Sequence, residues 1–341
     1  MDVEEIVALS VKHNAADLHL CSGHLPHWRR HGVLEPMPDF PPIASAQLEA
    51  LAQRWLDAPQ QRCLAADGHI DFAMTAGDQR LRANLFRQRM GMSLALRLIA
   101  DKCPSLEDLR LPASVPPLLA QQDGLILITG ATGSGKSTTL ASMVDELNQH
   151  QARHIITLED PVEFIHVSRR ALIQQRQIGL HCSSFQQGLR AALREDPDVI
   201  LLGELRDLDT ISLALTAAET GHLVLATLHT RGAAQAVDRL IDVFPAEQKN
   251  LVRSQLAGSL KAIIAQRLTA AKEAGRIGLY EVLINTPAVA SLIREGKTHQ
   301  IGGLLQTGMQ SGMQTFEQSL RQRERQGLIA TLSDSQTSFP E

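Results

Sequence analysis

"GLILITGATGSGKSTTLASMV", residues 124–144, joins an apolar run to a glycine-rich loop and then to a helical pattern. Within it, Gly130 to Ser137 fit the pattern G-x-x-x-x-G-K-[ST], the Walker A loop. Glycines let successive backbone N–H groups turn inward around an anion, and the helix that follows adds the positive end of its dipole. We therefore expect a strand at 125–129, a phosphate-binding loop and a helix that begins near Lys136.

The loop and the first turn of its helix supply nine candidate nucleotide-binding residues. The Lys136 amine is expected to reach the β- and γ-phosphates, and the Ser137 hydroxyl to ligate Mg²⁺. The alternative is a glycine-rich turn that matches the pattern by chance, and the strand–loop–helix context opposes it. The sequence thus predicts that ATP and Mg²⁺ bind to the residues Gly130, Ala131, Thr132, Gly133, Ser134, Gly135, Lys136, Ser137 and Thr138.

The rest of the chain predicts an α/β fold in two parts. Residues 1–100 combine short helical patterns with alternating strands, which indicates a small α+β domain. The proline-rich residues 101–123 suit a linker. In 124–330, apolar runs at 125–129, 154–158, 198–202 and 223–228 alternate with helical patterns, which is typical of a mainly parallel sheet covered on both faces.

The end of the chain is expected to be helical from residue 246 on. Leu256, Leu260, Ile264 and Leu268 recur at a spacing of four, as on one helix face. Residues 331–341 are expected to be a disordered tail.

Composition excludes several classes of function. The chain has 341 residues, 44% hydrophobic and 21% charged, with a net charge of −4, as in ordinary soluble proteins. Aromatic residues make up 3%, which with the acidic balance opposes nucleic-acid binding. Four scattered cysteines form no zinc pattern. The N-terminus is too polar for a signal peptide, and no apolar run approaches the ~18 residues of a membrane span. We expect a cytoplasmic protein that reaches an inner membrane only by docking.

Carboxylates for hydrolysis follow two of the expected strands. "ITLEDPVEF" carries Glu163, and "DPDVILLGELRD" places Glu204 directly after an apolar strand, where ligands bind in open α/β sheets. Many P-loop enzymes have an Mg²⁺-binding Asp where this chain has Gly203, so Glu204 is expected to act on Mg²⁺, directly or through water. A helix cap or a surface charge is the alternative for each carboxylate.

Two histidines flank a further strand in "TGHLVLATLHT". His229 follows the strand on the side of the phosphate loop, where it could sense the γ-phosphate, and His222 precedes it. Structural histidines that only satisfy local hydrogen bonds are the alternative.

The loop "GATGSGKSTT" and the stretches "TLEDPVEF", "REDPDVILLGELRD" and "TAAETGHLVLATLHT" occur in this order. Together they resemble the secretion-superfamily ATPases, most closely the PilT-like pilus retraction motors, and the resemblance covers nearly the whole chain. It implies a homo-hexameric ring with a PAS-like N-terminal domain and a RecA-like ATPase domain. Such rings hydrolyse ATP to move subunits of type IV pili, and the implied partner is a PilC-like platform protein of the inner membrane.

The resemblance also implies roles for individual residues. Glu163 would help to position the attacking water, Glu204 would be the catalytic carboxylate, and His222 and His229 would form a histidine box. Arginines of the N-terminal domain, Arg82 and Arg97, would meet nucleotide bound between domains or subunits and stabilise charge on the leaving phosphate. For these arginines, solvated charge on a strand is the alternative.

Three features concern the subclass. Extension motors carry a longer N-terminal region and a four-cysteine zinc insert, and their absence here favours retraction. Retraction motors typically have "AIRNLIRE" near the C-terminus, where this chain has "AVASLIRE", Ala288 to Glu295. A divergent paralogue that serves another appendage therefore stays open, as does a nucleotide switch without turnover. A nucleic-acid motor of the RecA class is opposed by the composition.

Overall fold

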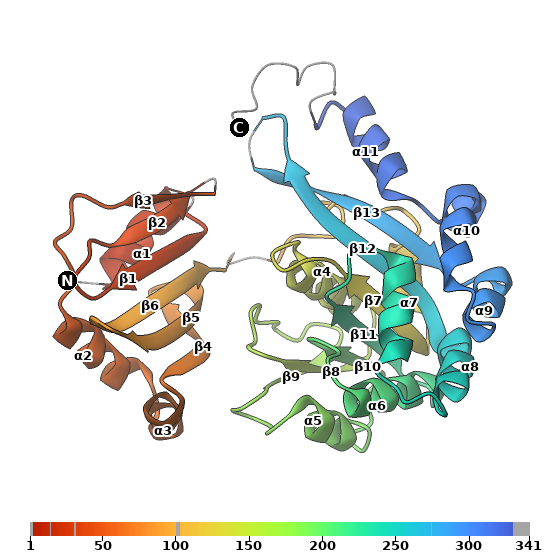
Figure 1. The fold of residues 1–341 in the computed structure, drawn as a ribbon, viewed down its shortest axis with the longest axis horizontal. Coiled ribbons are helices and arrows are strands. Elements are labelled where there is room, and N and C mark those ends of the chain that lie inside the picture. The colour runs from red at the N-terminus through yellow and green to blue at the C-terminus, as the bar shows by residue number, and fades with distance from the viewer. Residues whose placement is uncertain (1–2, 14, 31, 100–102, 274, 330–341) are drawn as a thin grey trace. The chain divides into compact units, whose positions relative to one another are not determined.

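The structure is a computed structural model that describes residues 3–13, 15–30, 32–99, 103–273 and 275–329. The chain divides into two compact units (Figure 1). The first unit comprises Met1–Lys102 together with Pro161–Phe164, and the second comprises Cys103–Asp160 and Ile165–Glu341. The tail expected at 331–341 lies outside the described residues.

The first unit is an antiparallel six-stranded sheet, in the order β3-β2-β1-β6-β5-β4, with three helices. Apolar side chains of the helices, among them Ile6 and Leu48, pack with Leu18 and Leu81 of the strands. The unit thus has its own core. Its elements are α1 (Val3–Lys12), β1 (Asp17–Cys21), β2 (His27–Arg30), β3 (Val33–Pro36), α2 (Ser45–Trp55), α3 (Ala58–Asp67), β4 (His69–Ala76), β5 (Gln79–Gln88) and β6 (Gly91–Leu98).

The second unit contains a seven-stranded sheet in the order β13-β12-β7-β11-β10-β8-β9. Every neighbouring pair is parallel except β12 and β13, which form an antiparallel edge. The strands are β7 (Gly124–Thr129), β8 (His154–Glu159), β9 (Leu172–Gln177), β10 (Val199–Leu202), β11 (Leu223–Leu228), β12 (Leu260–Ala270) and β13 (Arg276–Ile284).

Helices lie on both faces of this sheet, as a parallel sheet requires. Before β7 comes the 3₁₀ helix η1 (Pro116–Ala120), whose Leu119 is buried with Leu106 and Val115 in the core of the second unit. The other helices are α4 (Lys136–His150), α5 (Phe185–Ala192), α6 (Leu208–Glu219), α7 (Ala233–Asp242), α8 (Lys249–Ser259), α9 (Pro287–Arg294), η2 (Thr298–Gln300), α10 (Ile301–Thr307), η3 (Gly308–Ser311) and α11 (Phe316–Arg325).

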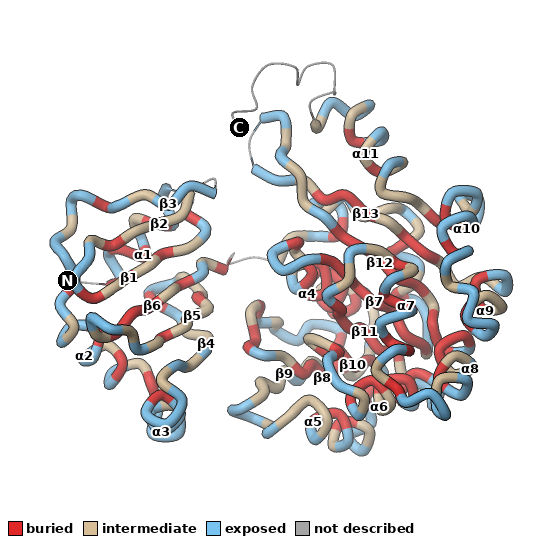
Figure 2. Tube along the Cα trace, in the orientation of Figure 1, coloured by how far each residue is buried: buried red, intermediate tan, exposed pale blue. Residues whose placement is uncertain are grey.

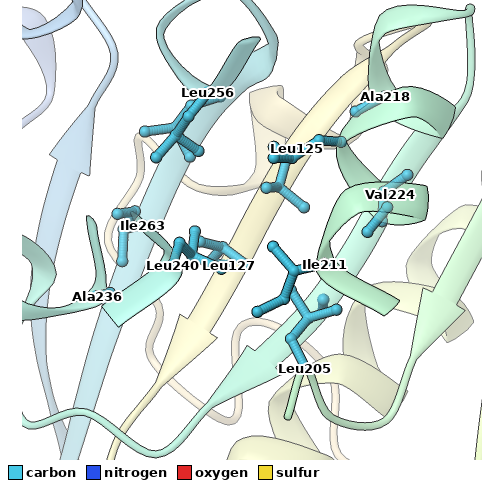
Figure 3. Close-up of a cluster of buried hydrophobic side chains, with 14 of the residues drawn as sticks. Leu125, Leu127, Leu205, Ile211, Ala218, Val224, Ala236, Leu240, Leu256 and Ile263 are labelled. Carbon is cyan, nitrogen blue, oxygen red and sulfur yellow. The ribbon is translucent and has the colours of Figure 1, made fainter. Parts of the chain in front are cut away.

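The central strands of the second unit are buried along their whole length. All six residues of β7 and of β11, and all four of β10, are buried (Figure 2). Figure 3 shows one side of this core, where Leu125 and Leu127 of β7 lie near Ile211 of α6 and Leu240 of α7. Burial on both faces explains the uninterrupted apolar runs of the sequence, and the expectation of an α/β fold with a mainly parallel sheet is confirmed.

One expected helix is a strand. The spacing of Leu260, Ile264 and Leu268 predicted a helix, but these residues lie in β12, and helix α8 ends at Ser259. A spacing of four is even, so it fits the two-residue period of a strand as well as a helical turn. β12 pairs with β7 on one side and β13 on the other, and Ala262–Gln266 are buried in successive positions, so both faces of this part of the strand are covered. Among the described residues, no helix is long and apolar enough to cross a membrane.

Candidate functional site

The candidate site lies at one edge of the second unit's sheet, where parallel strands end. β7 and β11 end in register, with Thr129 opposite Leu228, and β10 lies on the other side of β11. The segments that follow these strands are the phosphate loop, His229 and Glu204. Parallel strands place their carboxyl ends on one edge, which is why residues far apart in the sequence meet here.

The phosphate loop has backbone conformations that depend on glycine. Gly133 and Gly135 have φ angles of 78° and 88°, in the left-handed region. At Gly130 a Cβ would lie 2.5 Å from the carbonyl oxygen of Gln266 and 2.5 Å from the Ser134 hydroxyl. Gly130 is therefore needed for the close approach of β12, and helix α4 begins at Lys136 directly after the loop.

The Lys136 side chain is folded back onto the loop. Its Nζ donates to the carbonyl oxygens of Gly130 at 2.8 Å and Ala131 at 3.1 Å, and lies 3.4 Å from Nδ1 of His229. Lys136 is only 7% exposed. Burial lowers the pKa of its amine, and the negative charge of Glu204 opposes that shift. The amine is thus buried, and binding of an anionic ligand beside it would stabilise its charged form.

His229 links Lys136 to Glu204, so that these three residues form a chain of contacts. Nε2 of His229 lies 3.3 Å from Oε1 of Glu204, and Oε2 of Glu204 accepts from Nη2 of Arg206 at 2.7 Å. The phosphate-loop lysine, the histidine after β11 and the carboxylate after β10 are therefore linked through His229.

The Glu204 carboxyl is held in its ionised form. Burial acts to raise its pKa, but the hydrogen bond and charge of Arg206, with smaller electrostatic contributions from His229 and Lys136, outweigh burial and lower the pKa. An ionised carboxylate at the end of a strand can orient a water or bind a cation.

The backbone beside Glu204 is fixed by its neighbouring strands. The Thr227 hydroxyl of β11 donates to the Gly203 carbonyl oxygen, and the Gly203 amide donates to Leu158 of β8 at 2.8 Å. A Cβ at Gly203 would lie 3.3 Å from the Leu158 carbonyl oxygen, tighter than ordinary contact. A side chain is thus disfavoured where many P-loop enzymes carry an Asp, and Glu204 is the carboxylate at the end of this strand.

His222 does not join the other candidates. It directly precedes β11, whereas His229 directly follows it, so a six-residue strand separates the two residues. A strand of that length spans roughly 20 Å. Nδ1 of His222 lies 3.0 Å from the Ala217 carbonyl oxygen, a local contact at the end of α6.

Three further candidates belong to the first unit. Arg82 on β5 and Arg97 on β6 are directly paired across the sheet, and Arg97 is also paired with Asp17 on β1. Nε of Arg97 donates to Oδ1 of Asp17 at 2.9 Å. Nη1 of Arg82 lies 3.4 Å from Oε1 of Glu163. The two arginines thus form a basic pair on one sheet face, each with a carboxylate partner.

Two residues of the site carried no strong sequence signal. Arg206 follows Glu204 by two residues in a segment without regular secondary structure, and this spacing alone could have suggested that the two side chains meet. Gln266 lies in the segment that was predicted to be a helix, and only the pairing of β12 with β7 brings its side chain to the loop. No sequence pattern pointed to it.

Residues 3–334 match the model of a protein family described as type II/IV secretion system protein. Protein YggR of Escherichia coli (strain K12), named as uncharacterized, is 62% identical over 331 residues, which are 96% of this chain and 100% of that protein. The type IV pilus retraction ATPase PilT of Pseudomonas aeruginosa is 44% identical over 331 residues, 97% of this chain and 96% of that protein.

Solved structures extend the similarity to three dimensions. A crystal structure of the pilus retraction motor PilT with bound ADP matches with a TM-score of 0.88 and 42% sequence identity. The match covers 100% of this chain and 98% of that chain, so both units have counterparts there.

Proposed function

The chain belongs to the family of type II/IV secretion system proteins, and we propose that it is an ATP-hydrolysing motor that retracts type IV pili. The observation that carries the proposal is the chain of contacts from Lys136 through His229 to Glu204 at the end of three parallel strands. It joins the residue type that binds a γ-phosphate to the residue type that orients a water. The relatives that match over their full length and are named retraction ATPases support the direction of movement.

The residues of the loop fit a triphosphate with Mg²⁺. Ser137, in the first turn of α4, is exposed. Glu204 follows β10 at the same edge of the sheet. A hydroxyl and a carboxylate are oxygen ligands of the kind that Mg²⁺ prefers. We infer that Ser137 would hold the ion and that Glu204 would contact it directly or through water. Bound Mg²⁺ would neutralise charge on the phosphates.

Catalysis by the chain's own residues follows from the present contacts. Lys136 leaves the carbonyl oxygens of Gly130 and Ala131 and turns to the phosphates, whose charge offsets the burial of the amine. Glu204, ionised and released from part of its ion pairing, orients water for attack on the γ-phosphate in line with the leaving oxygen. His229 transmits the displacement of Lys136 to Glu204. We propose that Glu163, Arg82 and Arg97 also take part in hydrolysis. The arginines would stabilise charge on the leaving phosphate.

We further propose that six copies form a ring, and that the ring works in the cytoplasm while docked on an inner-membrane platform protein of the PilC type. A second output is favoured by one observation. In α9, Ala290 and Ser291 replace the Arg and Asn that retraction motors typically have, and Ser291 instead donates to Glu295 at 2.9 Å. The altered helix, with Ala290 buried and Ser291 partly exposed, favours a paralogue that hydrolyses ATP but moves another appendage.

Two variants test the hydrolysis. Lys136→Ala should lose both nucleotide binding and turnover, because the phosphates lose their cation. Glu204→Gln, nearly identical in shape, should still bind ATP but hydrolyse it at least about a hundredfold more slowly. Both are measured by phosphate release with Mg²⁺ and by titration with a fluorescent ATP analogue. Unchanged turnover in both variants would refute the site.

The output is tested separately in a deletion strain of the host bacterium. Cells with more surface pili and no twitching would support retraction. A strain with unchanged pili, from a protein that hydrolyses ATP in vitro, would assign the motor to another appendage.

A further inference from the structure

We infer that Gln266 is a positioning residue of the phosphate loop, a role that rests on the nucleotide binding proposed above. Gln266 lies on β12, one residue beyond Ala265, the last residue paired with β7. Its side chain therefore enters the structure at the point where β7 turns into the loop. Gln266 is 3% exposed, so both ends of its amide must find partners within the protein.

The amide of Gln266 connects the loop to the first turns of helix α4. Its Nε2 donates to the Ser134 carbonyl oxygen at 2.7 Å, and its Oε1 accepts from the Thr139 hydroxyl at 2.8 Å. A carbonyl oxygen can only accept, so the nitrogen must face Ser134, and the oxygen is left for Thr139. This arrangement satisfies both ends of the amide in only one orientation.

The contact matters because of how a phosphate loop binds an anion. For its amides to point inward, carbonyl groups of the loop must point away from the ligand. Ser134 is itself buried, at 6% exposure, so its outward carbonyl has little water to bind. Gln266 supplies the missing donor. Without it, the carbonyl would gain a partner only by rotating its peptide, which would also turn an adjacent N–H away from the phosphate.

The surrounding packing supports the same role. A Cβ on Gly130 would lie 2.5 Å from the Gln266 carbonyl oxygen, and one on Gly135 would lie 2.8 Å from its Nε2. Gln266 thus approaches the loop with both main chain and side chain. It acts through the loop and does not touch the phosphates, which is why it is a positioning residue and not a catalytic one.

The test compares three variants by their affinity for ADP. Gln266→Glu keeps the shape and the acceptor for Thr139 but replaces the donor to Ser134 with a carboxylate oxygen. We expect the dissociation constant for ADP to rise about tenfold or more at pH 8. Burial should raise the pKa of the introduced carboxyl, and its protonated form carries an O–H that can donate to Ser134. Relative to wild type at each pH, affinity should therefore recover to within about threefold near pH 5.5.

Two variants separate positioning from packing. Gln266→Met fills a similar volume without any hydrogen bond and should stay weak at both pH values. Thr139→Val removes only the second hydrogen bond and should bind ADP within about threefold of wild type. Circular dichroism of each nucleotide-free variant checks that it folds. Should Gln266→Glu not fold at pH 8, its affinity at pH 5.5 and that of Gln266→Met at both values carry the comparison.

The outcomes distinguish this inference from the proposed function. Gln266→Glu that binds ADP within twofold of wild type at pH 8 would overturn the role, and so would equal, pH-independent losses in Gln266→Glu and Gln266→Met. A wild-type chain that binds ADP without hydrolysing ATP would refute the motor but leave the positioning role intact. A wild-type chain that binds no ADP would overturn both.

Discussion

Glu204 is shared between two neighbours, His229 and Arg206, and this decides its chemistry. Oε1 faces His229, and Oε2 is bound to Arg206. His229 also contacts Lys136 and can follow a bound phosphate, whereas Arg206 is two-thirds exposed and free to move into solvent. The effect of Arg206, which is to keep the Glu204 carboxyl ionised, can therefore be tested separately from the contact between His229 and Lys136.

Removal of Arg206 should change how hydrolysis depends on pH. In the wild type the pKa of Glu204 lies below its ordinary value of 4.5, so the carboxylate is ionised throughout the range from pH 5 to 8. Without the hydrogen bond and charge of Arg206, burial is less opposed and the pKa rises. We expect Arg206→Gln to lose turnover as the pH falls toward 5, while the wild type does not. Rates of phosphate release across this range check it.

Arg239, an exposed arginine of α7, provides the matched control for that experiment. Arg239→Gln removes the same charge away from the site and should follow the wild-type profile. An Arg206→Gln profile parallel to that of the wild type would show that Arg206 does not set the ionisation of Glu204.

The two histidines of the motif should differ in importance. His229 contacts both Lys136 and Glu204, whereas His222 lies at the opposite end of β11 and contacts Ala217. We expect His229→Ala to lower turnover at least about tenfold, and His222→Ala to keep it within about threefold. Steady-state ATPase rates of the two purified variants decide between this geometry and a shared histidine box. Equal losses would mean that His222 acts on hydrolysis by another route.

At the scale of elements, the sequence predicted best where one physical cause acts alone. β7, β8, β10 and β11 are buried on both faces, and nothing but a covered parallel sheet produces four such apolar runs between helical patterns. The Walker A pattern then located the loop, because its glycines have a specific geometric purpose. Both predictions rest on local sequence.

The elements that sequence reasoning missed depend on distant partners. The sequence of β12 predicts a helix, since an even spacing of leucine and isoleucine does not distinguish the two periods. Only its pairing with β7 and β13 makes it a strand. The position of Gln266 beside the loop depends on that same pairing. The contact between Glu204 and Arg206 depends on a segment after β10 that has no regular secondary structure.

A partly buried carboxylate contacts the start of helix α7. Oε1 of Glu281, on β13, accepts from the backbone N–H of Ala233 at 2.8 Å. Burial raises the pKa of Glu281, although this hydrogen bond and the charge of Arg267 act to lower it. The folded chain thus binds this proton more tightly than the unfolded chain, so stability falls as the pH rises from 4.5 through the folded-state pKa.

Replacement of the Glu281 carboxyl by an amide should remove this loss of stability at higher pH. Glu281→Gln keeps an oxygen for the Ala233 N–H but cannot ionise, so its melting temperature at pH 7 should exceed that of the wild type by about 1–3 °C. Near pH 4 the two proteins should melt alike, because Glu281 is then protonated. Thermal unfolding followed by circular dichroism between pH 4 and 8 checks this, and a lower melting temperature at pH 7 would contradict it.

At the scale of the whole molecule, the candidate residues are divided between the two units. Lys136, His229 and Glu204 belong to the second, and Arg82 and Arg97 belong to the sheet of the first. In a ring of the kind proposed above, the arginines of one copy would complete the site of its neighbour. A motor gains from this division, because hydrolysis then depends on how adjacent copies are placed.

Mixed rings test whether two copies share a site. Lys136→Ala and Arg82→Ala should each be nearly inactive alone, since each lacks a cation that we propose to act on the phosphates. In an equal mixture of subunits, a site built from two copies receives its intact lysine and its intact arginine each half of the time, so about a quarter of wild-type turnover should return. The proteins are mixed, dissociated and reassembled with Mg²⁺ and ATP, and phosphate release is measured. If each site were built within one copy, no mixture would contain an intact site, and the mixed rings would stay as inactive as their parents.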